Sequence, residues 1–274
     1  MTSQNMKLSL GPILFFWPKE TLIDFFFFFL DAPLDTVYHG EVVCSRGQKL
    51  KRLRKIAGQG KFKIEANDMG AVKLAREHGI PFVAGATLNI YNEATLDVFR
   101  QLGAYRWIPP AELSRDKIAI ITAAADGIET ELFAWGKIPL AYSSRCFTAR
   151  HYNLNKDSCE FRCLDHEHGM TMNTREGQPF LTVNGIQTMS YGCQSLLAHH
   201  QDAADIGISM LRLSPQLTDM PRIIELHRAV LNGQTDSATA LDELKRLATG
   251  TLVDGYWHGQ PGIETLKEEL YATA

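Results

Sequence analysis

The sequence lacks an apolar run long enough to cross a membrane. Its two most apolar stretches are Ile13–Trp17 and Leu22–Leu30; Pro18–Glu20 separates them, and Asp24 interrupts the second. A helical span needs about 18 or more apolar residues in succession, so we expect no membrane span. The first residues carry only Lys7 as a positive charge, and no small-x-small cleavage site follows. We therefore expect no signal peptide, and we expect a cytoplasmic location.

The sequence also lacks an excess of positive charge. Lys and Arg number 28 against 31 Asp and Glu, which gives a net charge of −3 at pH 7. This balance excludes a generally basic nucleic-acid-binding protein, and we expect no DNA partner. The basic residues do crowd into Arg46–Lys63, which contains no acid. That segment is typical of a solvated helix face with Leu50, Leu53 and Ile56 turned inward, or else of a patch for RNA, acidic lipid or an acidic partner.

Familiar enzyme motifs are missing as well. No GxGxxG or GxxxxGK[ST] follows an expected strand, so nothing indicates a nucleotide-binding loop. GxSxG and HExxH are also lacking, and with them the usual signs of a hydrolase. The composition, 45% hydrophobic and 22% charged, is that of a globular protein.

Short β-type runs alternate with helical patterns along most of the chain. This alternation predicts parallel βαβ units, and therefore an α/β fold that is either a doubly wound sheet or a (β/α) barrel. We treat residues 1–274 as a single barrel-like domain. The expected strands are Lys7–Leu14, Thr36–Glu41, Phe62–Ala66, Pro81–Gly85, Tyr105–Ile108, Glu129–Trp135, Pro179–Val183 and Ile206–Leu211. The clearest expected helices are Lys19–Leu30, one capped by Asn67 or Asp68, one capped by Asn92, Glu112–Ala125, Arg222–Leu231 and Leu241–Leu247.

Two segments depart from this rhythm. Residues 141–178 are polar and hold three cysteines and three histidines, which indicates a cysteine-rich insertion between strands that carries function. The run Phe25–Phe29 has no periodicity. We expect it to form a buried helix or strand beneath the barrel, the alternative being an exposed membrane or partner patch.

The cysteines give the strongest chemical signal. There are five, an odd number that argues against a disulfide framework in a chain with no expected export signal. Cys146, Cys159 and Cys163 are closely spaced, and thiolates select zinc, copper(I) or iron–sulfur clusters. A [4Fe-4S] cluster needs a fourth thiolate, which either Cys44 or Cys193 could supply. A structural zinc with three cysteines and one histidine, or buried thiols without any ligand, are the alternatives.

Several polar side chains fall near the ends of expected strands, where they could line a pocket. From these we select Glu65, Asn89, Tyr91 and Glu112 as candidate substrate-pocket residues. The full set is Glu41, Glu65, Asn67, Asn89, Tyr91, Glu112 and Arg115.

Motifs over nearly the whole chain resemble the collagenase-like peptidase family. Within that family they are most similar to the branch that acts in oxygen-independent ubiquinone biosynthesis. The segments that carry the resemblance are Leu10–Leu14, Tyr38–Arg46, Ile64–Asp68, Pro81–Gly85, Leu88–Asn92, Pro110–Arg115, Leu140–Arg150, Val183–Thr188, Arg212–Pro215 and Gly255–Trp257.

The resemblance implies a fold and a cofactor. It implies an incomplete or modified (β/α) barrel and a [4Fe-4S] cluster bound by Cys44, Cys146, Cys159 and Cys163, with no such role for Cys193. Family members usually carry a further strand and helix between the segments of Cys44 and Ile64. Here only the short basic stretch joins them, which predicts one βα unit fewer.

The resemblance also implies a function and partners. The chain would be the iron–sulfur subunit required for hydroxylating the ring of the ubiquinone precursor without dioxygen, as a heterodimer with a UbiU-like paralogue. The hydroxyl donor would be of the prephenate type, and peptidase activity is not implied for this branch. Other branches hydroxylate RNA, and the basic stretch is the support for that alternative. A noncatalytic protein with a structural zinc site is the other alternative.

Overall fold

Seven strands pair in parallel to form a curled sheet in the order β2-β1-β10-β6-β5-β4-β3. The computed structural model describes residues 6–29, 31–40, 54–55, 58–59 and 61–264. Its strands are β1 Lys7–Leu10, β2 Thr36–Val37, β3 Ile64–Ala66, β4 Phe82–Ala84, β5 Ala104–Trp107, β6 Glu129–Tyr142, β7 Met170–Asn173, β8 Pro179–Asn184, β9 Gln187–Ser195, β10 Met210–Leu213 and β11 Leu252–Val253. Its α-helices are α1 Lys19–Phe28, α3 Met69–Glu77, α4 Glu93–Gln101, α5 Arg115–Ala124, α6 Phe147–His151, α7 His200–Asp205, α8 Met220–Leu231 and α9 Ser237–Leu247.

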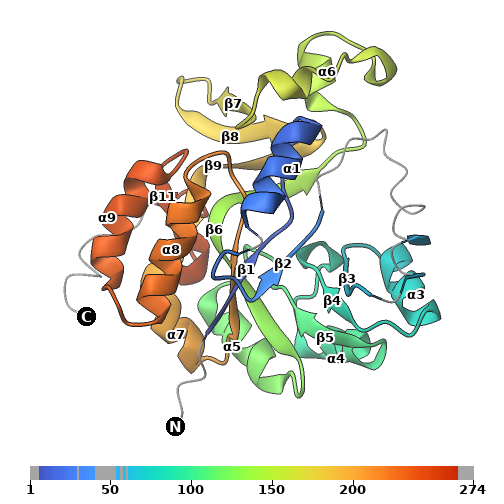
Figure 1. Ribbon diagram of the computed structural model, residues 1–274, viewed down its shortest axis with the longest axis vertical. Coiled ribbons are helices and arrows are strands. Elements are labelled where there is room, and N and C mark those ends of the chain that lie inside the picture. The colour runs from blue at the N-terminus through green and yellow to red at the C-terminus, as the bar shows by residue number, and fades with distance from the viewer. Residues whose placement is uncertain (1–5, 30, 41–53, 56–57, 60, 265–274) are drawn as a thin grey trace.

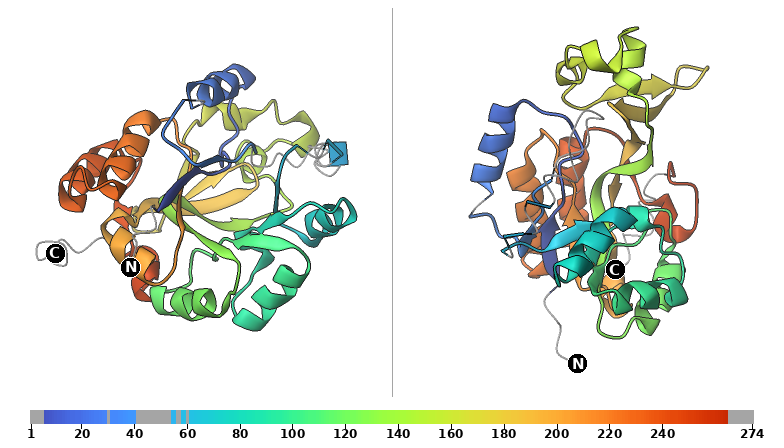
Figure 2. Two further views of the ribbon diagram at one scale, coloured as in Figure 1. Left: turned by 60° about the horizontal axis from the view of Figure 1, so that its bottom comes forward. Right: turned by 90° about the vertical axis from the view of Figure 1, so that its right-hand side faces the viewer.

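The sheet curls without closing. Helices lie around its outside, as Figures 1 and 2 show. Strands β2 and β3 are the two ends of the parallel order, and within the described residues they do not pair with each other. The α/β class and the incomplete (β/α) barrel are therefore confirmed. The predicted caps are confirmed too: Asp68 accepts a hydrogen bond from the Ala71 N–H at 2.9 Å, and Asn92 accepts one from the Thr95 N–H at 2.8 Å.

An antiparallel extension continues from the barrel. Strand β6 runs on to Tyr142, beyond the expected end at Trp135, and pairs with β9, which pairs with β8, which pairs with β7. Strands β7 and β8 project with α6 from one end of the molecule (Figure 1). Most of residues 141–178 lie in this projection, including the three described cysteines of the insertion.

The predicted strands differ from the structure in several places. Strands β7, β9 and β11 were not predicted, and the predicted strands Lys7–Leu14 and Thr36–Glu41 end earlier, at Leu10 and Val37. Strand β9 was not expected, because Gln187, Ser190 and Gln194 interrupt any apolar pattern, yet all three are buried and bond to main-chain carbonyls. The expected strand Ile206–Leu211 starts later, at Met210, because α7 occupies the chain up to Asp205. In both places tertiary hydrogen bonds and packing outweighed the local pattern.

The phenylalanine run is helical, but the prediction that it is buried was wrong. Phe27 and Phe28 are 68% and 63% exposed, whereas Phe29 is only 4% exposed and belongs to the main core. Successive residues on a helix point about 100° apart, so five identical side chains cannot all face one core.

No described helix is both long enough and apolar enough to span a membrane, as the sequence predicted.

We predict a sharp contrast within this run. Replacing Phe29 by Ala should lower the free energy of unfolding by about 3 kcal/mol, because a buried aromatic ring is removed from the core. The matched variant Phe28→Ala removes the same atoms from an exposed position. Urea denaturation should therefore show a shifted midpoint for Phe29→Ala alone, and equal shifts would contradict the packing described here.

Candidate functional site

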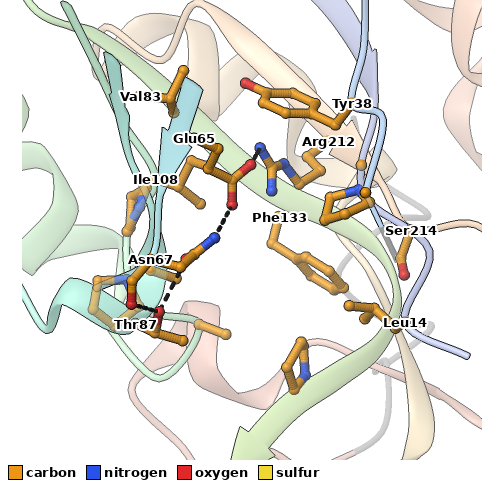
Figure 3. A pocket seen from close by; sticks show the side chains of 18 of the residues that line it. Leu14, Tyr38, Glu65, Asn67, Val83, Thr87, Ile108, Phe133, Arg212 and Ser214 are labelled. Carbon is orange, nitrogen blue, oxygen red and sulfur yellow. Dashed lines mark hydrogen bonds and ion pairs between the residues drawn. The ribbon is translucent and has the colours of Figure 1, made fainter. Parts of the chain in front are cut away.

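A cavity of about 1230 Å³ opens at the carboxyl ends of the parallel strands. Residues that follow β1, β2, β3, β4, β5 and β10 line it, which is where barrel folds assemble their sites. Figure 3 shows side chains from these strands facing one another across the space. The residues that line it include Tyr38, Glu65, Asn67, Asn89, Glu112, Phe133, Tyr142, Arg212 and Ser214.

Arg212 on β10 is the central charge of the cavity wall. Its guanidinium donates to Glu65 Oε2 at 2.8 Å and to Glu131 Oε1 at 2.7 Å. The ring of Tyr38 lies against the same guanidinium, 4.2 Å away. Arg212 is thus held by two carboxylates and one aromatic face, which fixes its position.

Glu131 is fully buried beneath this group. Its carboxylate accepts hydrogen bonds from Ser9 at 2.6 Å, Tyr38 at 2.6 Å and Arg106 at 3.2 Å, besides that of Arg212. Burial alone would raise the pKa of Glu131, but the attraction of Arg212 and the hydrogen bonds of Ser9 and Tyr38 outweigh it and hold the pKa below its ordinary value. Glu131 is therefore an anion at neutral pH.

A second arginine extends the network. Arg106 on β5 donates to Glu129 at 2.6 Å, and Lys7 donates to the other oxygen of Glu129 at 2.6 Å. Three cations and three carboxylates thus balance, through pairs that join β1, β3, β5, β6 and β10. Such a network is rigid, and it presents hydrogen-bonding groups to the cavity without a net charge.

The rest of the wall is largely apolar and aromatic. Phe62, Tyr105, Phe133 and Tyr142 line the cavity with several prolines and branched aliphatic residues. Flat aromatic walls with a few fixed polar groups suit a small aromatic or other ring-shaped molecule.

Two polar groups of the cavity are placed to meet a ligand. Ser214 Oγ is buried at the wall and has no hydrogen-bond partner among the described residues. Asn67 donates to Glu65 at 2.8 Å, and its carbonyl oxygen accepts from Thr87 at 3.0 Å, so its orientation is fixed. Figure 3 shows Asn67, Glu65 and Arg212 as one chain of contacts.

The four selected candidate pocket residues lie at this cavity or directly beside it, whereas Glu41 lies outside the described residues. Glu65, Asn89 and Glu112 line it, and Asn89 does so from a left-handed backbone conformation that asparagine tolerates. Tyr91 donates to Glu112, and this hydrogen bond raises the pKa of Tyr91 to about 12. Arg115 instead pairs with Asp202 of α7, at 2.6 Å.

Sequence reasoning missed the central residues of the network. Arg212 stands between Leu211 and Leu213 in a buried strand, and Glu131 stands on β6 near the start of another. A charged residue inside the otherwise apolar run of a strand that is buried on both faces is the sequence signal that points to such residues.

Three of the four candidate cluster cysteines lie in the described projection, and Cys44 lies outside the described residues. Cys146 precedes α6, Cys159 is buried after a short 3-10 turn, and Cys163 lies in a 3-10 helix, Arg162–Asp165, that packs on α6. Cys146 and Cys159 are free thiols. Cys193 is a core residue of β9, and burial raises its pKa to about 12, which is typical of an inert structural thiol.

The family model of peptidase family U32 matches residues 34–267. The chain belongs to this family. The match covers the parallel strands from β2 onward, the cysteine projection and the α8–α9 pair. The predicted membership of the collagenase-like peptidase family is thereby confirmed.

Curated relatives carry one common name. The chain is 29% identical to "tRNA hydroxylation protein P" of Escherichia coli over 42% of this chain and 26% of that protein. The protein of that name from Haemophilus influenzae is 34% identical over 35% of this chain and 22% of its own length. The Helicobacter pylori J99 protein is 26% identical over 74% of this chain and 45% of its own length. The chain thus spans less than half the length of these relatives.

Among solved structures, one titled "PhdJ bound to substrate intermediate" aligns with 90% of this chain and 78% of its own, at 10% identity and a TM-score of 0.31.

We predict that the Glu131 charge supports both stability and its dependence on pH. Glu131→Gln keeps the shape but leaves Arg212 with one carboxylate fewer, so the free energy of unfolding at pH 7 should fall by about 3 kcal/mol. Because the folded pKa lies below the ordinary 4.5, the wild type keeps this stabilisation above that pH and loses it as the pH falls through the lowered value.

Urea titrations at pH 7 and at successively lower pH measure both effects. Glu131→Gln should lack the part of the acid-induced loss of unfolding free energy that comes from protonation of Glu131. Glu243→Gln, which removes the surface partner of Arg222, is the matched control and should leave the urea midpoint unchanged. A wild-type-like midpoint for Glu131→Gln would contradict the network's role.

Proposed function

We propose that the chain is a UbiV-like subunit of an oxygen-independent hydroxylation system. Its substrate would be the ring of the ubiquinone precursor, its hydroxyl donor a prephenate-type molecule, and its partner a UbiU-like paralogue in a cytoplasmic heterodimer. The family membership and the hydroxylation named in the relatives support the reaction class. The observation that carries the choice of a small ring substrate is the aromatic-walled cavity at the strand ends.

The cavity's polar groups fit this substrate class. A planar ring would pack against the aromatic walls, while Ser214, Asn67 and Glu112 offer hydrogen bonds at its edge. Arg212 contributes a fixed donor direction, but Glu65 and Glu131 already balance its charge. We therefore expect the cavity to select a ligand by shape and hydrogen bonds more than by net charge.

We propose that Cys44, Cys146, Cys159 and Cys163 hold a [4Fe-4S] cluster. The described thiols fit this role, because thiolates are the usual ligands of such clusters and all three lie on elements of one small projection. When bound there, the cluster would supply one-electron redox chemistry.

The projection is joined to the cavity by its contacts. Trp17 donates to the Glu167 carbonyl at 3.2 Å, and the Phe16 ring stacks on Phe161 at 5.7 Å. Both contacts come from the segment that follows β1, whose earlier residues line the cavity. This arrangement supports a single site that uses cavity and cysteines together.

Hydroxylation of tRNA is the second candidate, favoured by the name of the curated relatives. The exposed basic side chains Arg54, Lys55, Lys61 and Lys63 support it from the described part of the basic stretch. Lys63 also lines the cavity. Binding through these groups would weaken steeply with salt.

We predict that single cysteine replacements separate ligands from core thiols. Anaerobically purified wild type should carry about four irons and four sulfides per chain, the stoichiometry of the cluster. Cys159→Ala and Cys163→Ala should each lose most of this iron and the visible absorption. Cys193→Ala is the matched control and should keep both. Full iron in the Cys159 and Cys163 variants would refute the ligand assignment, and one zinc without sulfide would indicate a structural zinc site instead.

We predict that anaerobic ubiquinone synthesis depends on this chain. In a strain that lacks its own copy of this subunit, grown without oxygen, the wild-type chain should restore ubiquinone, while Cys159→Ala should restore at least tenfold less. Mass spectrometry of quinones and of digested tRNA from the same cultures measures both products. Restored tRNA hydroxylation with unchanged quinone would overturn the proposal in favour of the second candidate.

A further inference from the structure

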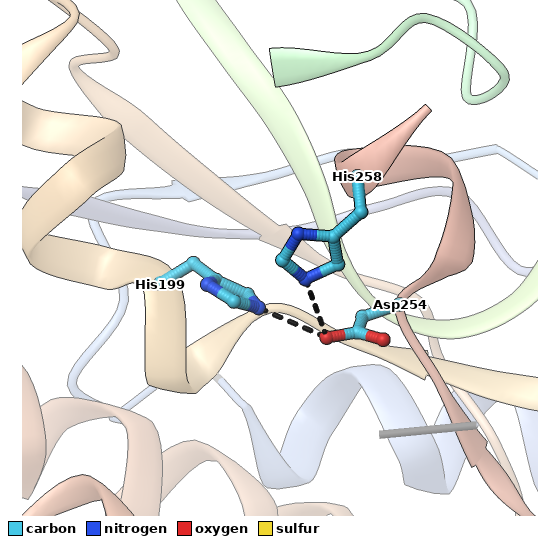
Figure 4. A group of neighbouring side chains, drawn as sticks. All are labelled: His199, Asp254 and His258. Atoms are coloured by element: carbon cyan, nitrogen blue, oxygen red, sulfur yellow. Dashed lines mark hydrogen bonds and ion pairs between the residues drawn. The ribbon is translucent and has the colours of Figure 1, made fainter. Parts of the chain in front are cut away.

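A second group of ligating side chains lies away from the cavity. His199 Nε2 is 3.0 Å from Asp254 Oδ2, and His258 Nε2 is 3.1 Å from the same oxygen. Figure 4 shows both imidazoles directed at this carboxylate from opposite segments. The ligand atoms of all three residues lie within 4.8 Å of one another, and no other set of three or more such side chains meets that limit in the described part of the chain.

The fold brings these residues together through one strand pair. Strand β11 pairs in parallel with β9, so the carboxyl ends of both strands lie at the same edge. His199 ends the 3-10 helix Leu197–His199 that follows β9, and Asp254 directly follows β11. His258 lies one turn further on, in the 3-10 helix Gly255–His258.

The group is held in place before any ligand arrives. Asp254 is 3% exposed, and its main chain accepts from the Trp257 N–H at 2.9 Å and donates to the Glu264 carbonyl at 3.3 Å. The indole of Trp257 stacks on the His199 ring at 5.7 Å. His258 is the most exposed member, with 37% of its side chain open to solvent. A buried carboxylate and a fixed imidazole thus face one side that solvent can reach.

We propose that His199, Asp254 and His258 bind one divalent transition-metal ion of the zinc or ferrous class. Two imidazoles and one carboxylate are a ligand set that these ions use, with water or another ligand completing the shell. Metal–ligand bonds of about 2.0–2.1 Å place neighbouring ligand atoms roughly 2.9 to 3.4 Å apart. The two distances to Asp254 Oδ2 fall within that range.

This site is separate from the cavity and from the cysteines. None of the three residues lines the cavity. The ion would join the segment after β9 to the segment after β11, so it would stabilise the position of β11 and of the residues that follow it. The competing interpretation is a plain hydrogen-bonded His–Asp–His group without metal, and the experiment below distinguishes the two.

The test uses the purified full chain after metal removal, with Co²⁺ as the probe. Cobalt bound by imidazole and carboxylate shows weak visible bands without the near-ultraviolet thiolate-to-cobalt absorption that cysteine ligands give. We expect one equivalent of such cobalt on the wild type. His258→Gln and His199→Gln should each weaken it at least tenfold, the loss that even indirect support of a metal site brings.

The controls keep the result open to refutation. His78→Gln replaces an exposed histidine at the end of α3 and should bind cobalt as the wild type does. Circular dichroism checks that each variant is folded, and the exposed position of His258 makes its variant the safer one. Zn²⁺ should raise the melting temperature of the wild type and of His78→Gln by more than that of the His199 and His258 variants, in which any zinc bound by the cysteines would still act. The site would be overturned if the folded His199 and His258 variants both kept cobalt binding and zinc stabilisation. It would also be overturned if the wild type showed neither. Either result would leave a hydrogen-bonded His–Asp–His group without metal. Neither outcome bears on hydroxylation.

Discussion

The pairing of Arg212 with Glu131 and Glu65 is the interaction on which the barrel depends. Glu65 lies on β3 at one end of the parallel order, and Tyr38, which follows β2 at the other end, bonds to Glu131 and packs on Arg212. No strand pairing joins these two ends among the described residues. Charge-assisted hydrogen bonds through the interior therefore link the two unpaired ends of the sheet, and these bonds lie beside the cavity.

Such a network is costly to build, because each charge must leave water. It is stable here because every carboxylate has several donors: Glu131 alone receives bonds from Ser9, Tyr38, Arg106 and Arg212. An apolar core of similar shape would often be at least as stable, so stability does not explain the choice of charged residues. We infer that the network is kept for what it orients, namely Asn67, Glu65 and Arg212 at the cavity wall.

The features that could be predicted from the sequence are those that depend on residues close together in the chain. The caps at Asp68 and Asn92 and the βα alternation depend on neighbours in the chain, and they were found. The network could not be found in this way, since Arg212 and Glu65 are 147 positions apart and only the fold makes them partners. Strand β9 was missed because its buried glutamines Gln187 and Gln194 bond to carbonyls that are distant in the sequence. The exposure of Phe27 and Phe28 was missed because a uniform run hides which side of a helix faces the core.

The segment after β1 connects the two halves of the proposed site. Gly11, Pro12 and Leu14 line the cavity, while Phe16 and Trp17, a few residues later, hold the cysteine projection by stacking and by a hydrogen bond. The Leu14 carbonyl itself accepts bonds from Asn184 and Gln187, at the turn between β8 and β9. These contacts connect the projection directly to the cavity wall. If the cysteines hold the proposed cluster, its binding would stiffen the projection and, through these few residues, the cavity wall, and it would thereby couple cluster assembly to the shape of the cavity.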